Sequence, residues 1–413
     1  MAEKQEFTRK LKSRHIQLMA LGGTIGTGLF LGSGKAIHAA GPAILLAYLI
    51  TGIICFGIMR ALGELLLSDL HYHSFMDAIR DYLGNRVSFV MGWAYWVCWL
   101  ALAMAEVTAI GLYFQLWFPQ VPQWLPGLVT LLILLGLNLM TVSTFGELEF
   151  WFALIKILAI VILIAVGVIL VLLHFHSASG YLATPANLVN DGGFFATGTK
   201  GFMLSFQMVV FAFVGIEMVG VTAAEAENPK VVIPKAINGI PVRIMLFYIG
   251  ALAVIMCIYP WSKLSPSNSP FVLVFRDIGL PGAASIVNFV VITAAASACN
   301  SAIYSTGRML RSLSQEGSAP KKFRQLTSHR VPGNALVFST IVIFISVILN
   351  YVMPSEVFTL VSSIATTCFL FIWGILVYTH LKYRKSMLGK KEHTFKMPFY
   401  PYSNFLVFAY MIF

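Results

Sequence analysis

Charged side chains are scarce in this chain. Asp, Glu, Lys and Arg together make up 11% of its 413 residues, whereas hydrophobic residues make up 58%. A soluble domain carries roughly 25% charged residues, because its surface faces water. The composition therefore excludes an ordinary soluble domain. It indicates an all-α polytopic membrane protein that is surrounded by the lipid bilayer.

Metal-binding and catalytic motifs are also missing. The five cysteines lie singly within apolar runs and form no CxxC pair. His71 with His73, and His174 with His176, have HxH spacing, but the sequence offers no third ligand nearby. A zinc site needs at least three protein ligands. No nucleophile and base are placed together as in an enzyme. We therefore expect no metal, no cofactor and no enzymatic activity.

The net charge of +11 is explained by topology. No basic groove interleaved with aromatic residues accompanies it, so we expect no nucleic acid partner. Lys and Arg stay preferentially on the cytoplasmic side of a membrane. Placing the N-terminus inside the cell puts most of the 28 Lys and Arg residues on that side. We therefore expect a multi-pass protein of the cytoplasmic membrane with a cytoplasmic N-terminus.

Long apolar runs recur from one end of the chain to the other. A membrane-spanning helix needs about 20 mostly apolar residues. Runs of this length are found at 16–37, 42–66, 87–118, 124–143, 151–173, 201–222, 237–260, 283–307, 334–353 and 357–381. A further run begins near Phe405 and holds only about nine residues up to Phe413, so we expect this eleventh span to be incomplete.

Two of these runs are interrupted by residues that disfavour a continuous membrane helix. The first contains the glycine-rich segment Gly22–Gly28, and the sixth contains Phe211–Glu217. Interrupted helices at corresponding places in two halves of a chain indicate a transporter site near the bilayer midplane. Each half here has five spans, which is an odd number, so the second half must be inverted relative to the first.

This reading divides the chain into four segments. We expect a cytoplasmic N-terminus at 1–15 and a first five-helix repeat at 16–173. The second, inverted five-helix repeat is expected at 201–381. A cytoplasmic loop and the incomplete eleventh helix follow at 382–413.

The interruption in span one is predicted to bind a carboxylate. The outer half of that span begins near Gly26, Thr27 and Gly28, where free amide groups carry partial positive charge. Glycine at two of these positions lets a ligand approach the backbone, and Thr27 adds a hydroxyl donor. We expect the neighbouring Ile25 to line the same site. Close packing of small residues against another helix is the alternative explanation.

The interruption in span six is predicted to bind an ammonium group. Its outer half ends near Phe211 and Val214, whose carbonyl groups carry partial negative charge, and the carbonyl group of Thr24 in span one adds to them. A carboxylate site beside an ammonium site fits the backbone of an α-amino acid. Phe211 or Phe213 is placed to close over such a ligand as a gate, although ordinary packing is the alternative for both.

Three ionisable residues lie deep in apolar sequence, where charges are costly and usually functional. Glu106 lies near the middle of span three, where we expect a role in the pocket or in proton transfer rather than a structural hydrogen bond. Glu217 follows the second interruption. It either takes part in proton coupling or caps backbone amide groups that the interruption leaves unpaired. Lys156 is either a protonatable cation that takes the place of a metal ion, or a side chain that reaches the cytoplasmic surface.

Three further acidic residues lie near the cytoplasmic ends of predicted spans. A solvated or loop-bracing role is the default at such a position. We expect it for Glu64, Glu147 and Glu149.

Several motifs together resemble those of the amino acid permeases of the amino acid–polyamine–organocation superfamily. The resemblance extends over essentially the whole chain, and within the superfamily it is greatest to bacterial transporters of D-serine, D-alanine and glycine. The segments that carry it are Arg14–Leu18, Gly22–Phe30, Phe145–Lys156, Asn190–Gly193, Phe213–Glu217, Glu225–Pro229, Ala295–Ser305, Gly307–Leu310 and Lys396–Pro398.

The resemblance implies a fold and an activity. The fold is LeuT-like, with a five-plus-five inverted repeat, broken helices one and six, and twelve spans, so this chain would end within the eleventh. The activity is proton-coupled uptake of small neutral amino acids. The resemblance also implies that Lys156 replaces sodium and that Glu106 takes part in selecting the side chain. Uptake of proline, aromatic or cationic amino acids, obligate exchange, and amino acid sensing are the alternatives.

Overall fold

The computed structural model describes residues 25–72, 74–140, 142–218, 228–266, 269–277, 281–386 and 395–412. In this part of the chain, regular structure is helical apart from an isolated β-bridge between His176 and Leu182. Seven stretches of the described helices are long and apolar enough to cross a membrane. The expected all-α polytopic membrane protein is therefore confirmed.

The spanning stretches are built from the following helices. They are α3 and α4 (Gly32–Ala40 and Ile44–Ser68), α6 (Asn85–Phe114), α8 (Val142–Leu172), α11 to α13 (Pro229–Asn238, Ile240–Arg243 and Ala251–Ile258, with the π-helix Ile244–Gly250), α15 (Pro281–Gln315), α16 with α17 (Gly333–Ile343 and Ile345–Val352), and α18 (Val357–Lys385). Shorter helices are α5 (Phe75–Leu83), α7 (Trp124–Asn138), α14 (Pro270–Asp277) and α19 (Tyr402–Ile412).

The two interrupted spans stand out because their helices are short. In span one, α2 (Thr27–Phe30) precedes α3, and the residues before Ile25 lie outside the described part. In span six, α9 (Gly198–Phe211) ends inside the protein and is followed by turns up to Glu217. Neither span is a single long helix in the described residues, which agrees with the predicted interruptions.

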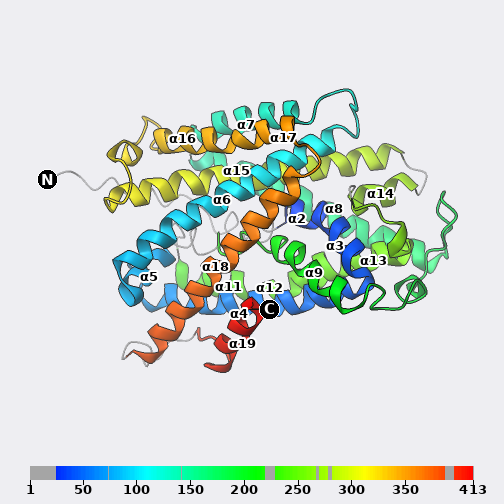
Figure 1. Ribbon diagram of the computed structural model, residues 1–413, viewed down its shortest axis with the longest axis horizontal. Helices are drawn as coiled ribbons and strands as arrows, with labels where there is room; N and C mark the ends of the chain where they lie inside the picture. Colours follow the sequence, from blue (N-terminus) through cyan, green and yellow to red (C-terminus); the bar gives the residue numbers. More distant parts are fainter. Residues whose placement is uncertain are drawn as a thin grey trace.

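Two long helices form the centre of the molecule. In Figure 1, α6 and α15 run side by side through the molecule, with α4 on one side of them and α7, α16 and α17 on the other. Of the most apolar stretch of α6, 78% is buried within the protein, compared with 22% for α8, whose outer face is left for lipid. Helices α3 and α9 contact each other, so the two interrupted spans are neighbours.

Glu64 is not solvated, and its contacts fit the loop-bracing alternative of the expectation. Its side chain is fully buried, and its carboxylate accepts hydrogen bonds from His380 Nε2 at 3.0 Å, Arg384 Nη2 at 3.0 Å and the backbone amide of Met397 at 2.7 Å. Hydropathy along the chain indicates only how deep Glu64 lies along its helix. The chain around Met397 and the end of α18 pack against the side of α4 and cover the Glu64 side chain. Glu147, by contrast, is exposed as expected.

The division into 1–15, 16–173, 201–381 and 382–413 stays a prediction. Residues 1–15 lie outside the described part, as do 387–394 of the last segment. The described helices overlap the predicted runs, but some extend well beyond them, as α8 does by beginning at Val142 and not at 151.

Candidate functional site

The two interruptions touch each other in the structure. Gly28 lies against the end of α9 so closely that an added Cβ would be 2.6 Å from Ala212 Cα and 3.1 Å from the carbonyl oxygen of Phe211. Both atoms belong to the backbone and have no freedom to rotate away. Glycine is therefore required at position 28, and two segments far apart in the sequence form one site.

A carboxylate from a third helix occupies the start of α2. The backbone amide of Thr27 donates a hydrogen bond to Glu106 Oε1 of α6 at 3.4 Å, and a Cβ added at Gly26 would lie 2.8 Å from the same oxygen. Amide groups at the beginning of a helix favour a negative charge. The amide that we predicted to bind a ligand carboxylate thus contacts the protein's own carboxylate in this structure.

Two polar atoms at this point have no hydrogen-bond partner among the described residues. They are the hydroxyl of Thr27 and Oε2 of Glu106, and both side chains are almost completely buried. The Thr27 hydroxyl lies near the Glu106 carboxylate, but not in normal hydrogen-bond geometry. Buried polar groups are nearly always paired in native proteins. Unpaired groups at a helix interruption are typical of a place where a ligand or a proton binds.

The chain after α9 forms tight turns. The amide of Val214 donates to the carbonyl group of Phe211 at 3.2 Å, and the Tyr248 hydroxyl donates to the carbonyl group of Ala212 at 3.0 Å. A carbonyl oxygen has two lone pairs, so the Phe211 oxygen can accept a second hydrogen bond. Thr24, whose carbonyl group was predicted to join this set, lies outside the described residues.

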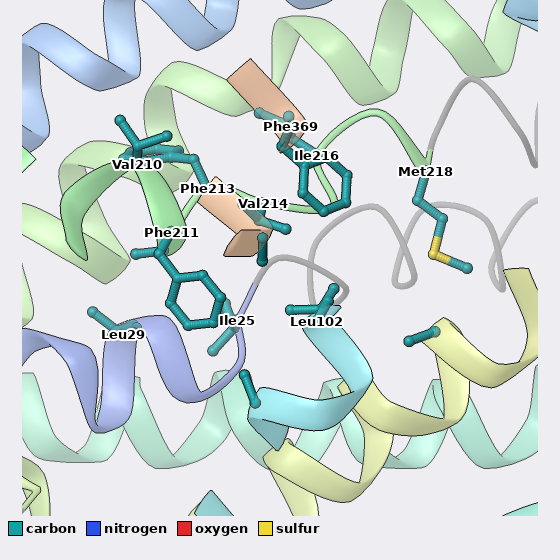
Figure 2. Packing of buried hydrophobic residues seen from close by; sticks show 14 of the residues in the cluster. Ile25, Leu29, Leu102, Val210, Phe211, Phe213, Val214, Ile216, Met218 and Phe369 are labelled. Atoms are coloured by element: carbon teal, nitrogen blue, oxygen red, sulfur yellow. The ribbon is translucent and has the colours of Figure 1, made fainter. Parts of the chain in front are cut away.

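The two candidate gate residues pack differently. Figure 2 shows Phe211 in the buried cluster with Ile25 and Leu29. Its ring also meets Phe358 edge-on at 6.0 Å between centroids, and Phe358 lines a cavity of about 700 Å³. The Phe213 ring is instead stacked on Tyr248, with centroids 4.9 Å apart. Of the two rings, therefore, only Phe211 meets a residue that lines this cavity.

Lys156 and Glu149 are two buried ionisable residues on α8. Lys156 is fully buried, which argues against a side chain that reaches the membrane surface. It interacts electrostatically with Glu149 and Glu106. Glu149 is also buried, and its Oε1 accepts a hydrogen bond from Ser297 of α15 at 2.6 Å. The charges of span three and span five are thus close enough to influence each other.

The expectation of a solvated edge position was wrong for Glu149, and sequence reasoning missed this residue as part of the site. Hydropathy placed it near the end of a span, but α8 begins at Val142 and carries Glu149 into the protein. A signal was present, because Glu149 and Lys156 are seven residues apart and therefore lie on one face of a helix. Ser297, its partner on α15, had no such signal.

Glu217 is held by hydrogen bonds at both carboxylate oxygens. Tyr95 of α6 donates to Oε1 at 3.3 Å, and Trp373 of α18 donates through Nε1 to Oε2 at 3.1 Å. The carboxylate also lies within hydrogen-bond reach of the Gly215 backbone. These contacts fit the bracing role that we left open for Glu217. No pattern in the sequence predicts that Tyr95 and Trp373 bind Glu217.

A buried polar site between interrupted membrane-spanning helices is typical of membrane transport proteins. Comparison with known proteins makes the assignment specific. A model of the amino acid permease family matches residues 15–413. The chain therefore belongs to the amino acid permease family, and the resemblance seen in its motifs is confirmed.

Three relatives show the range of this similarity. The chain is 62% identical to the amino-acid permease AapA of Bacillus subtilis (strain 168), covering 100% of this chain and 89% of the relative. It is 50% identical to the D-serine/D-alanine/glycine transporter of Escherichia coli (strain K12), covering 99% and 88%. It is 42% identical to the probable threonine/serine transporter YbxG of Bacillus subtilis (strain 168), covering 100% and 89%. These relatives are transporters, which points to a role other than enzymatic catalysis.

Proposed function

We propose that this protein imports small neutral amino acids, namely glycine and either enantiomer of serine and alanine, together with protons. The observation that carries the proposal is the contact between the two helix interruptions at Gly28 and Ala212, with the buried carboxylate of Glu106 beside it. The names of the relatives at 50% and 42% identity support small substrates.

The substrate backbone is placed by the two interruptions. Its carboxylate takes the amide groups of Gly26, Thr27 and Gly28, and the Thr27 hydroxyl supplies a further donor. Its ammonium group takes carbonyl oxygens of Thr24, Phe211 and Val214. Glycine at 26 and 28 lets Glu106 and the Ala212 backbone approach the start of α2 closely. The ligand carboxylate therefore reaches these amide groups when the Glu106 side chain moves aside.

Glu106 links substrate binding to a proton. In this structure its carboxylate accepts a hydrogen bond from the Thr27 amide. The substrate carboxylate is proposed to bind the same amide. Two carboxylates at one place repel each other unless one of them is protonated. We therefore assign to Glu106 the proton that enters with the substrate, and protonation releases the Thr27 amide for the incoming carboxylate.

Lys156 supplies a protonatable positive charge without a metal ion. Lys156 interacts electrostatically with both Glu106 and Glu149. The loss or gain of a proton by one of these groups therefore changes how readily the other two bind a proton. We assign the coupling role to Lys156, with Glu149 as its partner. Glu217, whose carboxylate is already held by Tyr95 and Trp373, braces the second interruption.

Uptake by the purified full-length protein in liposomes tests the proposal. We expect accumulation of labelled glycine, alanine and serine when an inward proton gradient is imposed, and no accumulation when a protonophore collapses it. The panel includes both enantiomers of serine and alanine, as well as proline and lysine. Binding of glycine without accumulation under any proton gradient would show that transport is the wrong interpretation.

The substrate class is tested by Glu106→Gln. If Glu106 carries the coupled proton, this variant exchanges neutral amino acids across the membrane but no longer accumulates them against a gradient. A wild-type preference for lysine that disappears in Glu106→Gln would instead identify a cationic substrate paired with an ionised Glu106.

A further inference from the structure

The carboxylate of Glu149 has an oxygen that its hydrogen bond to α15 leaves unused. Oε1 accepts from the Ser297 hydroxyl at 2.6 Å, whereas Oε2 has no hydrogen-bond partner within the described residues. The Glu149 residue is 1% exposed. Polar atoms buried to this extent are rarely left unpaired, and ionisable residues inside a membrane protein usually mark the path of an ion or a proton. Glu149 therefore has the features of more than a structural link between α8 and α15.

A row of serines continues from Glu149 along α15. Ser297, Ser301 and Ser305 are spaced four residues apart, so they share one face of the helix. Their exposed fractions are 0%, 2% and 3%. The Ser301 hydroxyl lies near the Glu149 carboxylate, although not in normal hydrogen-bond geometry. The row thus begins at the carboxylate and extends about 12 Å along the helix axis.

The hydroxyl groups of Ser301 and Ser305 differ from those of their neighbours on α15. A buried serine or threonine in a helix commonly bonds its hydroxyl to a backbone carbonyl of the preceding turn. Thr306 does so, donating to the carbonyl oxygen of Ile303 at 2.8 Å. Ser301 Oγ and Ser305 Oγ have no partner in the part of the chain that the structure describes. Each hydroxyl is therefore free both to accept a proton and to donate one.

An asparagine pair orients the polar groups around Glu149. Asn138 of α7 donates through Nδ2 to Asn300 Oδ1 at 2.7 Å, and the same nitrogen donates to the carbonyl oxygen of Leu134 at 2.9 Å. The Asn300 amide thereby keeps its Nδ2 as a donor, and this group lies near the Glu149 carboxylate. Three helices, α7, α8 and α15, thus converge on one buried carboxylate.

The direction of the row follows from the predicted topology. Span five starts at the cytoplasmic side, so Glu149 lies about 10 Å nearer the cytoplasm than Lys156, which follows it by seven residues. Span eight runs towards the cytoplasm, and Ser305 therefore lies closer to it than Ser297. Arg308 and Arg311 follow on the last turns of α15, as expected for the cytoplasmic end of a span. The polar groups lead from the buried lysine towards the cytoplasm.

We propose that the coupled proton leaves for the cytoplasm through Glu149 and the hydroxyl row at Ser301 and Ser305. The inference rests on the proposed function, because it takes Lys156 as the coupling residue. The Lys156 ammonium group gives a proton to the Glu149 carboxylate, which becomes a neutral carboxyl group. That group then passes the proton along the serine hydroxyls to cytoplasmic water, and the carboxylate is restored for the next cycle.

The test separates release of the proton from movement of the substrate. Exchange of labelled glycine for internal glycine does not require the proton to leave, because the carrier returns with both substrate and proton. Net uptake under an inward proton gradient does require it. Both rates are measured for the purified full-length protein in liposomes, and a pH-sensitive dye trapped in the lumen reports the proton that arrives when glycine is added.

Four variants are compared with wild type. Glu149→Gln removes the proton acceptor with little change in shape, and Glu149→Asp keeps a carboxylate. The double variant Ser301→Ala/Ser305→Ala removes the two open hydroxyls. Thr306→Val is the matched control, because its hydroxyl is also buried on α15 but is already bonded to Ile303. Thermal unfolding of each protein checks that the fold is retained.

We expect Glu149→Gln to lower net uptake and lumenal acidification about 100-fold, as for the loss of a proton-transfer group, while exchange continues. Glu149→Asp should recover most of the net uptake. The double serine variant should lose about tenfold in net uptake, as for one or two hydrogen bonds, and Thr306→Val should lose none.

Three results would overturn the exit path. They are net uptake by Glu149→Gln at the wild-type rate, an equal loss of exchange and net uptake in that variant, and a double serine variant indistinguishable from Thr306→Val. The second of these would identify Glu149 as a structural link alone. Absence of net uptake in wild type would instead overturn the proposed function, and the exit path with it, so the two failures are distinct.

Discussion

Gly26 and Gly28 are two residues apart, yet a side chain at each would meet a different kind of obstacle. At Gly28 the obstacle is the backbone of Ala212, which moves only if the two interruptions separate. At Gly26 it is the carboxylate end of Glu106, which can rotate. The same added methyl group therefore has a different consequence at the two positions.

We expect Gly28→Ala to reduce amino acid uptake to background, because a contact of 2.6 Å with Ala212 Cα forces the interruptions apart. Gly26→Ala should retain uptake with KM raised about tenfold, since it displaces Glu106 and crowds the ligand without moving the backbone. Initial rates in proteoliposomes measure both effects. Gly136→Ala on α7 is the control, because a Cβ there would meet nothing within 4 Å. Equal rates for Gly28→Ala and Gly136→Ala would contradict the assigned contact.

The two buried glutamates near the interruptions differ in how their oxygens are used. Among the residues that the structure describes, Glu106 Oε2 has no hydrogen-bond partner, whereas both oxygens of Glu217 accept hydrogen bonds. A carboxylate that gains and loses a proton in each transport cycle needs an oxygen that is not engaged in a hydrogen bond. A carboxylate that holds a turn in place needs hydrogen bonds at both oxygens.

We therefore expect Glu217→Gln to lower the stability of the protein more than Glu106→Gln does. The amide of glutamine cannot accept from both Tyr95 and Trp373, so a buried donor loses its partner at a cost of about 1–3 kcal/mol. Thermal unfolding of the purified variants measures the difference. A more stable Glu217→Gln than Glu106→Gln would argue against the bracing role.

At the scale of helices, the sequence predicted the interruptions well because glycine, turns and apolar length are local properties. It predicted lateral neighbours poorly. A solvated or loop-bracing position was expected for Glu64 and Glu149, but both are buried by segments distant in sequence. The chain at Met397 covers Glu64, and Ser297 of α15 contacts Glu149. Hydropathy along one helix carries no information on which other helix covers it. The motifs that resemble those of a known family supplied the expected roles of Lys156 and Glu106 in the candidate site.

The cluster around Glu64 joins the end of α4 to α18. His380, Arg384 and the Met397 amide all donate to it, so its removal would leave buried donors without an acceptor. We expect Glu64→Ala to destabilise the protein by about 3–5 kcal/mol, as for the loss of one partner from a buried ion pair. Unfolding in detergent measures the change. Glu147→Ala is the control, since Glu147 is exposed, and a similar loss for both variants would contradict the burial of the cluster.

At the scale of the whole molecule, the charges that matter for transport come from different helices. Glu106 belongs to α6, Lys156 and Glu149 belong to α8, and the amides that we propose to bind the ligand lie at the start of α2. A movement of any of these helices relative to the others changes the distances between the charges. Under the proposed function, such a movement connects alternating exposure of the site to the gain and loss of a proton.

We expect Lys156→Gln to bind glycine but to accumulate none under an inward proton gradient. Glutamine is close in length to lysine and keeps hydrogen-bonding capacity, but it carries no charge to balance Glu149 and Glu106. Equilibrium binding and uptake, measured on the same preparation with sodium replaced by potassium, separate the two activities. Lys382→Gln at the end of α18 is a control for the loss of one positive charge away from the site. Sodium-dependent accumulation by the wild-type protein would contradict the coupling role of Lys156, because a lysine that takes the place of a metal ion leaves no need for sodium.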